Sequence, residues 1–297
     1  MNDKIVFIIN PISGKGKGKL IAPQITAYFK NTPYTINVLF AEYPGHAIEL
    51  TEQALKEKPK TIVACGGDGT INEVAQVLIG KNIPLGIIPI GSGNGLASNL
   101  EIPKEIKKAL GLIIHAPIHT IDVGRIQNQY FFSNAGFGID AQVIHRYAAA
   151  KKRNFIGYLK ASMWSFFNYN PSKLKIKLEG QSFLSQSYFF LLISNSNEAG
   201  YGISFTPQAK LNDGVFDVVA IEQLNFFELI HFAWSVITKQ IPKMKKATTF
   251  QTHAIEILST RKNIIAQVDG EPYEIHDPNI QLQIIPNALK VLTFKNI

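Results

Sequence analysis

The sequence predicts two domains: a three-layer α/β domain built on a parallel sheet, followed by a mostly antiparallel β domain. The chain has 297 residues, which fits about two domains of ordinary size. In its first part, short apolar runs alternate with segments of helical periodicity, a pattern typical of a parallel sheet with helices on both faces. From about Val123, a succession of strand patterns replaces this alternation.

The first domain is predicted element by element from this alternation. Strands are expected at residues 4–10, 35–40, 61–65 and 84–88, and helices at 20–29, 46–58 and 71–79. Glycine-rich loops follow three strand segments, after Asn10, after Cys65 and after Ile90. Because sites in parallel sheets lie at the carboxyl ends of the strands, we expect the three loops to converge on one edge of the sheet.

The second domain is predicted from strand patterns with two helical interruptions. Residues 173–178 alternate strictly between lysines and apolar residues, which indicates a half-buried strand. Further strands are expected at 188–193, 215–221, 254–258, 264–268 and 280–285, and helices at 155–167 and 226–239. A last strand at 290–294 fits either domain.

The most informative motif is Gly-Gly-Asp-Gly-Thr-Ile-Asn-Glu at residues 66–73, between a predicted strand and a predicted helix. Glycines let a phosphate approach the backbone, and a helix N-terminus favours an anion. Thr70 and Glu73 have the spacing of a capping box at the start of the helix. The acid Asp68 within such a loop indicates a metal ion or a proton-transfer role. An ordinary tight turn with a capped helix explains these residues less completely.

The other two glycine loops have residues suited to polyphosphate. Residues 10–19 combine glycines with Lys15, Lys17 and Lys19, although their spacing does not match a P-loop. Residues 91–97, Gly-Ser-Gly-Asn-Gly-Leu-Ala, offer hydroxyl and amide donors at a helix entry. Each loop alone is common, but beside the motif at 66–73 they complete a phosphate cradle.

Several acids follow the glycine loops. Asp122 ends a strand-like segment, Asp213 precedes a glycine, and Asp269 and Glu271 flank Gly270. Asp-Gly sequences are ordinary hairpin turns, so each is explained by structure alone. Gathered in space, such acids would hold the Mg²⁺ that phosphoryl transfer requires.

Composition limits the classes of partner and compartment. The net charge of +8 and pI of about 9.3 favour anionic partners such as nucleotides, nucleic acid or acidic lipid surfaces. Cys65 is the single cysteine, so no intrachain disulfide forms. No signal peptide is visible and no apolar run reaches membrane-spanning length. We therefore expect a cytoplasmic protein that meets a membrane only at its surface.

Two aromatic stripes have alternative interpretations. At helical spacing, one contains Phe155, Tyr158, Leu159, Met163, Phe166 and Phe167, and the other contains Phe226, Phe227, Ile230, Trp234 and Ile237. We favour the protein core for both stripes. The alternative is an acyl-chain pocket or a helix resting on a bilayer. The seven histidines show no spacing typical of a metal site.

These motifs together resemble the diacylglycerol kinase catalytic-domain family of lipid kinases, which includes bacterial diacylglycerol kinases and sphingosine kinases. The resemblance rests on the motifs at 10–14, 66–73 and 91–97, with further matches at 136–141, 211–217 and 269–271. It implies a nucleotide domain at 1–122, to which 287–297 return, and a β-sandwich for the lipid substrate at 123–286. The implied active site lies in the cleft between these domains.

The resemblance also implies roles for individual residues. Asp68 and Glu271 are the two candidates for the general base. ATP would be held by Asn10, Pro11, Ser13, Gly14, Lys15, Gly66, Gly67, Asp68, Gly69, Thr70, Asn72, Glu73, Ser92, Gly93 and Asn94. Mg²⁺ would be supported by Asp122, Lys210, Asp213, Val215 and Asp269, with the Asp213 loop contributing mainly backbone carbonyls.

Two departures from the family pattern leave the substrate open. Gly95 stands where many bacterial diacylglycerol kinases have an acid, and Ala41 stands where the family has a threonine. The loop at 91–97 is closer to the sphingosine and ceramide kinase form, which favours a sphingoid-like or other lipid over diacylglycerol.

The expected function is therefore ATP-dependent phosphorylation of a lipid hydroxyl on diacylglycerol, a sphingoid base or a related lipid. We expect peripheral contact with an anionic membrane surface and no nucleic-acid partner. A homodimer is compatible with the sequence, which does not determine the oligomeric state. The alternatives are a soluble-substrate kinase of the NAD-kinase type and a non-catalytic regulator that binds nucleotide or lipid.

Overall fold

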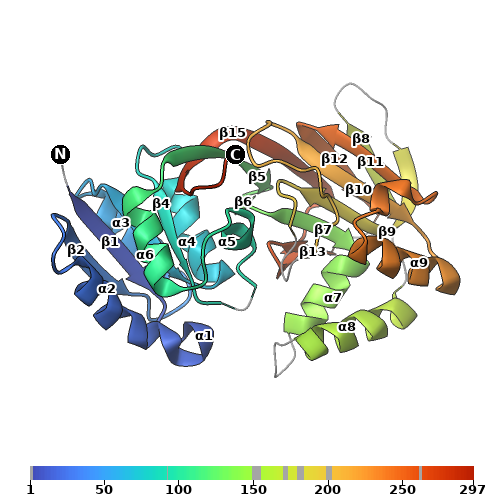
Figure 1. Ribbon diagram of the computed structural model, residues 1–297. Helices are drawn as coiled ribbons and strands as arrows, with labels where there is room; N and C mark the ends of the chain where they lie inside the picture. The colour runs from blue at the N-terminus through green and yellow to red at the C-terminus, as the bar shows by residue number, and fades with distance from the viewer. Residues whose placement is uncertain are drawn as a thin grey trace. The chain divides into compact units, whose positions relative to one another are not determined.

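The chain folds into two compact units in the computed structural model (Figure 1). The structure describes residues 3–91, 93–148, 155–169, 173–178, 184–198, 203–260 and 263–297. Unit 1 comprises Met1–Asp122 and Pro286–Ile297, and unit 2 comprises Val123–Ile285.

Unit 1 is built on a parallel sheet in the order β2–β1–β3–β4. Its strands are β1 (Lys4–Ile9), β2 (Thr35–Phe40), β3 (Thr61–Gly66) and β4 (Leu85–Pro89). All residues of β3 and β4 are buried, because helices cover both faces of the sheet. The strand β15 (Asn279–Leu292) starts in unit 2 and ends in unit 1, where Val291 pairs in parallel with Leu85 of β4.

The helices of unit 1 pack in pairs, α2 with α6 and α3 with α4, and Figure 1 shows the pairs on opposite faces of the sheet. Their bounds are α1 (Ser13–Gly16), α2 (Ile21–Phe29), α3 (His46–Leu55), α4 (Asp68–Leu78), α5 (Gly95–Asn99) and α6 (Ile106–His115), with a 3₁₀ turn at Lys17–Leu20. The chain moves from β1 to β2 on one side and then back past β1 to β3 on the other. Because both crossovers are right-handed, their helices must lie on opposite faces of the sheet.

Unit 2 is an antiparallel β structure with three helices in its described part. Its strands are β5 (Ile118–Ile126, which begins in unit 1), β6 (Gln129–Phe131), β7 (Asn134–Gly138), β8 (Lys173–Leu178), β9 (Leu184–Ser194), β10 (Phe216–Glu222), β11 (Ala247–Thr252), β12 (Ala254–Ser259), β13 (Ile264–Val268), β14 (Glu271–Ile275) and the first part of β15. The strand pairs within the unit are antiparallel. The helices are α7 (Ile139–Ala148), α8 (Phe155–Asn168) and α9 (Phe226–Ile237).

Two hydrophobic clusters explain why strands such as β10 are apolar on both faces. Phe216, Val218 and Ala220 point into a core enclosed by strands of the unit. Val219 and Ile221 point to the other side, into a cluster that includes residues of α7, α8 and α9. The three helices therefore cover the outer face of the β9–β10 sheet, as the lower right of Figure 1 shows.

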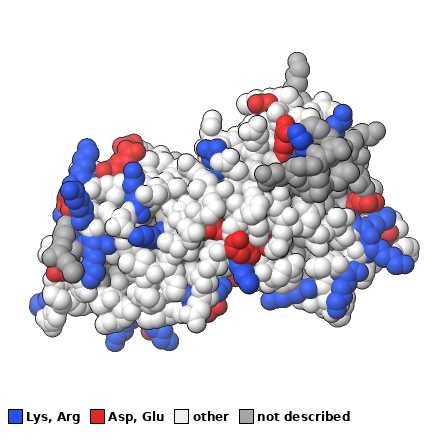
Figure 2. Space-filling view, turned by 90° about the horizontal axis from the view of Figure 1, so that it is seen from above, with Lys and Arg blue, Asp and Glu red and all other residues white. Residues whose placement is uncertain are grey.

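The predicted fold class, a parallel α/β domain followed by an antiparallel β domain, is confirmed. Several details differ. Helices α6 and α7 were not expected, and the two strands predicted at 280–285 and 290–294 are one continuous strand, β15. Lysine and arginine side chains form small separate groups on the face shown in Figure 2.

The aromatic stripe of α9 is not core, because its five large apolar residues are all exposed. Of the α8 stripe, Met163 is exposed, and the side chains of its other members lie outside the described residues.

Candidate functional site

Asn10, directly after β1, ties the first two glycine loops together. Its backbone N–H donates to the carbonyl of Cys65 at 3.0 Å, at the end of β3. Its side-chain amide donates to the hydroxyl of Thr70 in α4 at 3.2 Å, and its Oδ1 accepts from the N–H of Ile12 at 3.1 Å. Every polar group of this side chain is thus used to position backbone around the carboxyl ends of β1 and β3.

Glycines let the loops approach one another closely. A Cβ on Gly14 would lie 2.6 Å from a side-chain carbon of Ile90, so the first loop touches the third. A Cβ on Gly91 would lie 2.6 Å from the Cα of Gly67, so the second loop also touches the third. The three loops therefore converge at one edge of the unit 1 sheet, as the sequence predicted.

Asp68 joins the second and third loops through its carboxylate. Oδ2 accepts from the N–H of Asn94 at 2.8 Å, and Oδ1 accepts from the N–H of Gly95 at 2.6 Å. A Cβ on Gly93 would lie 2.8 Å from Oδ2, so the loop passes directly over the carboxylate. Burial raises the pKa of Asp68 above its ordinary value, and the two backbone hydrogen bonds only partly oppose this shift.

Glu73 does not cap its own helix, so the predicted capping box is wrong. Helix α4 begins at Asp68, two residues before Thr70, and has no side-chain cap. Instead, the Glu73 carboxylate accepts from the N–H groups of Gly45 and Ala47 at 2.9 and 3.2 Å. It therefore caps the N-terminus of the neighbouring helix α3, where unpaired amides favour a negative charge.

The N-terminus of α4 remains suited to a phosphate. The first N–H groups of a helix have no partner within it. Gly69 is exposed, and a Cβ there would meet nothing within 4 Å. In the first loop, Gly14, Lys15 and Gly16 have positive φ angles of 61°, 60° and 87°, so the backbone turns sharply there. These features fit the polyphosphate of a nucleotide.

The nucleotide residues suggested by the resemblance lie in unit 1, within these three loops and the first two turns of α4. Ser92 is outside the described residues. The others are Asn10, Pro11, Ser13, Gly14, Lys15, Gly66, Gly67, Asp68, Gly69, Thr70, Asn72, Glu73, Gly93 and Asn94. The side chain of Asn94 is buried and donates to the carbonyl of Gly91 at 2.6 Å, so it shapes its own loop.

In unit 2, Asp269 is held by backbone amides. It occupies the tight turn between β13 and β14, with φ 49°, followed by Gly270 with φ 79°. Its carboxylate accepts from the N–H groups of Phe132, Ser133 and Asn134 at 2.9, 2.7 and 3.1 Å. This arrangement fixes the turn against the start of β7. Glu271, two residues after Asp269, is exposed at the first position of β14.

A second acid, Asp140, lies beside the same turn in α7. Gln267 interacts with the Asp140 carboxylate and is itself bonded to the turn. Its amide donates to Asn134 Oδ1 at 2.7 Å, and its oxygen accepts from the N–H of Gly270 at 2.9 Å. A Cβ on Gly136 would collide with the carboxylate of Asp140 and with the amide of Gln267. Burial raises the pKa of Asp140 to about 6, opposed in part by Gln267. The sequence motif at 136–141 contained this acid, but its burial gave no signal before the fold was known.

The candidate magnesium residues are divided between the two units. Asp122 is fully buried in unit 1 and accepts from the N–H of Asn287 at 2.7 Å. Lys210, Asp213, Val215 and Asp269 belong to unit 2, where Asp213 accepts from the N–H of Val215 at 3.3 Å. In the described part of the chain, no three His, Cys, Asp or Glu residues form a group that could hold a metal ion.

Unit 2 also contains a cavity of about 310 Å³ beside α7. Its lining mixes apolar side chains with polar ones, and it includes Phe137, Gln142, Leu174, Asn263, Ile264 and Ile265. Gln142 contributes a buried amide oxygen that has no hydrogen-bond partner among the described residues. This mixed lining suits a ligand that has both polar and apolar parts.

Comparison with known families covers both units. Residues 4–126 match the diacylglycerol kinase catalytic domain, and residues 133–293 match the YegS C-terminal NAD kinase beta sandwich-like domain. A diacylglycerol kinase of Staphylococcus aureus (strain bovine RF122 / ET3-1) is 31% identical over 276 residues, which are 91% of this chain and 87% of that protein. The chain belongs to the diacylglycerol kinase catalytic-domain family. Kinases of this family use ATP.

Solved structures share the fold of this kinase family. A crystal structure from Bacillus anthracis (strain Sterne) has a TM-score of 0.82 at 22% identity, covering 98% of this chain and 95% of that one. Yeast NADH kinase, solved with NADH, has a TM-score of 0.51 at 10% identity, covering 98% and 84%. At these identities the likeness concerns the fold alone. In the described part of this family member, no helix is long and apolar enough to cross a membrane.

Proposed function

We propose that this kinase transfers the γ-phosphoryl group of ATP to the hydroxyl group of a lipid. The observation that carries the proposal is the convergence of three glycine loops on the N-terminus of α4, in a chain of the diacylglycerol kinase family. The lipid hydroxyl loses its proton to a base, its oxygen bonds to the γ-phosphorus, and the bond from that phosphorus to the ADP oxygen breaks.

Unit 1 holds the nucleotide in this proposal. The phosphates lie over Gly69 and the first amides of α4, where the helix terminus stabilises negative charge. Asp68 holds the third loop in place through Asn94 and Gly95. Mg²⁺ bound with the nucleotide would neutralise phosphate charge.

Unit 2 receives the acceptor lipid. The cavity beside α7 takes part of the apolar chain. Phe137 and Ile264 in its lining provide apolar surface for a lipid chain.

Glu271 is the general base in this proposal. It is exposed at the start of β14, next to a turn that Asp269 fixes rigidly. Asp68, in contrast, already accepts two short hydrogen bonds from backbone amides, and these would be disrupted if it took up a proton. Glu271→Gln should therefore lower kcat by about 10²–10⁴-fold with unchanged ATP affinity. Asp68→Asn should alter ATP affinity and thermal stability as well as kcat.

The test is to incubate the purified protein with labelled ATP, Mg²⁺ and separate acceptors: diacylglycerol, a sphingoid base, a mixed lipid extract and NAD. A labelled lipid, identified by mass, is the expected product. Labelled NADP would show the NAD-kinase alternative instead. ATP binding without transfer to any acceptor in the panel would overturn the proposal in favour of a binding protein.

A further inference from the structure

Helix α9 exposes an apolar face to solvent. Five large side chains on one side of the helix are exposed: Phe226 (55%), Phe227 (80%), Ile230 (55%), Trp234 (64%) and Ile237 (76%). Their spacing along the helix, with steps of three and four residues from 227 to 237, puts them on a common face. Contiguous exposed apolar surface of this kind marks an interaction site.

The opposite side of α9 anchors the helix to unit 2, so the exposed face is held in a defined orientation. Leu229, Phe232 and Val236 pack against the cluster on the outer face of the β9–β10 sheet, and Ser235 is buried. The exposed residues therefore cannot turn inward without giving up an established core.

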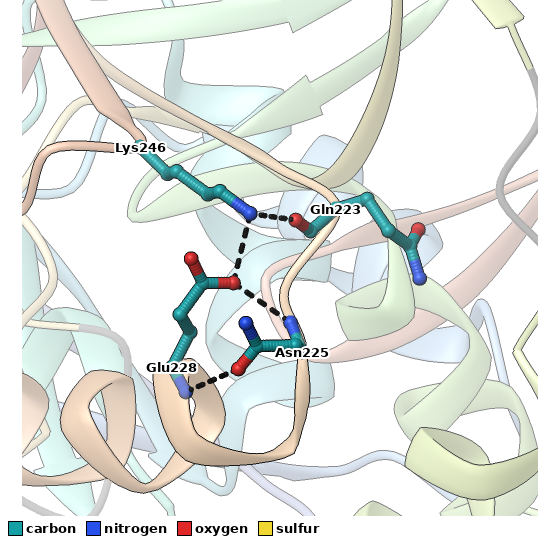
Figure 3. Close-up of polar contacts among 4 residues, drawn as sticks. All are labelled: Gln223, Asn225, Glu228 and Lys246. Carbon is teal, nitrogen blue, oxygen red and sulfur yellow. Dashed lines mark hydrogen bonds and ion pairs between the residues drawn. The ribbon is translucent and has the colours of Figure 1, made fainter.

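Polar contacts fix the beginning of α9 as well (Figure 3). Asn225 and Glu228 form a reciprocal capping box, with distances of 2.8 and 2.9 Å. Lys246, just before β11, reaches the Glu228 carboxylate and the carbonyl of Gln223, at 2.8 and 2.9 Å. The lysine holds the pKa of Glu228 below its ordinary value, with a further contribution from the N–H of Asn225. These contacts bind the start of α9 to the residues just after β10 and just before β11, while the apolar face of the helix remains exposed.

The sequence segment that contains this face is rich in lysine. Residues 225–250 contain four lysines, Lys239, Lys243, Lys245 and Lys246, and one acid, Glu228. The single acid is paired with Lys246, and Lys239, Lys243 and Lys245 are exposed directly after the helix. An apolar helix face with flanking lysines complements a surface that is apolar inside and anionic outside.

We propose that the exposed face of α9 is the surface by which the protein docks on an anionic lipid bilayer. Phe227, Trp234 and their neighbours enter the boundary between headgroups and acyl chains, while Lys243 and Lys245 contact anionic headgroups. The inference rests on the proposed lipid acceptor, because docking brings the enzyme to the surface where such a lipid resides.

Vesicle co-sedimentation tests this docking surface. Phe227→Ala/Trp234→Ala should weaken binding to vesicles of equal parts phosphatidylcholine and phosphatidylglycerol on the order of 100-fold, since two aromatic rings no longer leave water. The matched control, Ile118→Ala/Phe294→Ala, removes exposed apolar side chains from unit 1 and should bind like the parent protein.

The electrostatic part has its own pair of variants. Lys243→Gln/Lys245→Gln should weaken binding to the anionic vesicles roughly tenfold or more, and this loss should shrink at high salt. The control, Lys104→Gln/Lys107→Gln, changes the net charge equally within unit 1 and should have little effect.

Fluorescence locates the contact independently of activity. In a Trp164→Phe variant, Trp234 is the only remaining tryptophan of the two in the chain. Its emission should shift to the blue when anionic vesicles are added, and brominated lipids should quench it. Circular dichroism of each variant verifies that the fold is retained.

Two results would overturn the inference. One is vesicle binding by the parent protein that the α9 variants do not reduce. The other is a parent dimer in sedimentation equilibrium that Phe227→Ala/Trp234→Ala dissociates, because a second copy would then cover the face. Turnover of a water-soluble short-chain lipid separates this question from the proposed function. The α9 variants should turn over this soluble lipid as fast as the parent does. If the parent itself does not turn it over, that result counts against lipid phosphorylation but does not affect the conclusion from vesicle binding.

Discussion

Replacing Asp140 by asparagine should stabilise unit 2 at neutral pH. Burial raises the pKa of Asp140 from 3.8 to about 6, which is about two pKa units. At ~1.36 kcal/mol per unit, keeping this carboxylate ionised above pH 7 costs about 3 kcal/mol of folding free energy. The residue as a whole is partly exposed, but its Oδ2 is buried without a hydrogen-bond partner, which supports the direction of the shift.

The sign of the pH dependence follows from the raised pKa. Between about pH 4 and pH 6 the folded protein holds a proton on Asp140 that the unfolded chain releases. The stability of the parent should therefore fall as the pH rises through this window, while Asp140→Asn has no such loss. The two proteins should be similarly stable near pH 4, and the variant should be more stable by up to about 3 kcal/mol at pH 7.

Urea unfolding at pH 4 to 8 measures this difference, with separate signals for each unit. Both tryptophans, Trp164 and Trp234, belong to unit 2, so their fluorescence follows that unit. The single cysteine, Cys65, is fully buried in unit 1, and burial raises the pKa of its thiol, so its labelling rate reports on unit 1. Glu222→Gln, at an exposed acid of unit 2, is the control. A stability difference that stays constant from pH 4 to pH 7, or a variant less stable than the parent at pH 7, would refute the reasoning.

Two further predictions concern unit 1. Asp68→Ala removes the acceptor of two backbone amides and should destabilise the unit by about 1–3 kcal/mol. The expected signs are faster labelling of Cys65 and weaker ATP binding. Unchanged labelling together with lost turnover would instead indicate a purely chemical role. Glu73→Ala should lower the free energy of unfolding by about 1 kcal/mol, because it removes the cap of α3. The measurement is amide hydrogen exchange, which should increase in residues 46–50. Equal exchange in the parent and the variant would show that this cap contributes nothing.

The sequence predicted the parallel α/β unit well because its signals are local. The fully buried strands β3 and β4 are short apolar runs, and each glycine loop directly follows a strand. The carboxyl ends of parallel strands share one sheet edge whatever the details of packing, so the convergence of the loops also followed from the sequence. Long-range partners did not follow, because they depend on which helices become neighbours. Glu73 caps α3 rather than its own helix for this reason.

Hydrophobic periodicity determined that residues 226–237 form a helix, but it could not determine which environment the helix meets. When a helix is apolar around most of its circumference, its periodicity does not distinguish the buried face from the exposed face. The prediction that the aromatic stripe lies in the core was therefore wrong. Only the tertiary structure decided that Leu229 and Phe232 face the sheet while Phe227 and Trp234 face solvent. The same holds for Asp140, whose raised pKa results from burial among residues distant in sequence. The sequence by itself thus determined the main strands and helices of unit 1, the convergence of the glycine loops and the resemblance to the family. Tertiary packing decided which acids hold loops together, which acids are buried, and which apolar surface remains open.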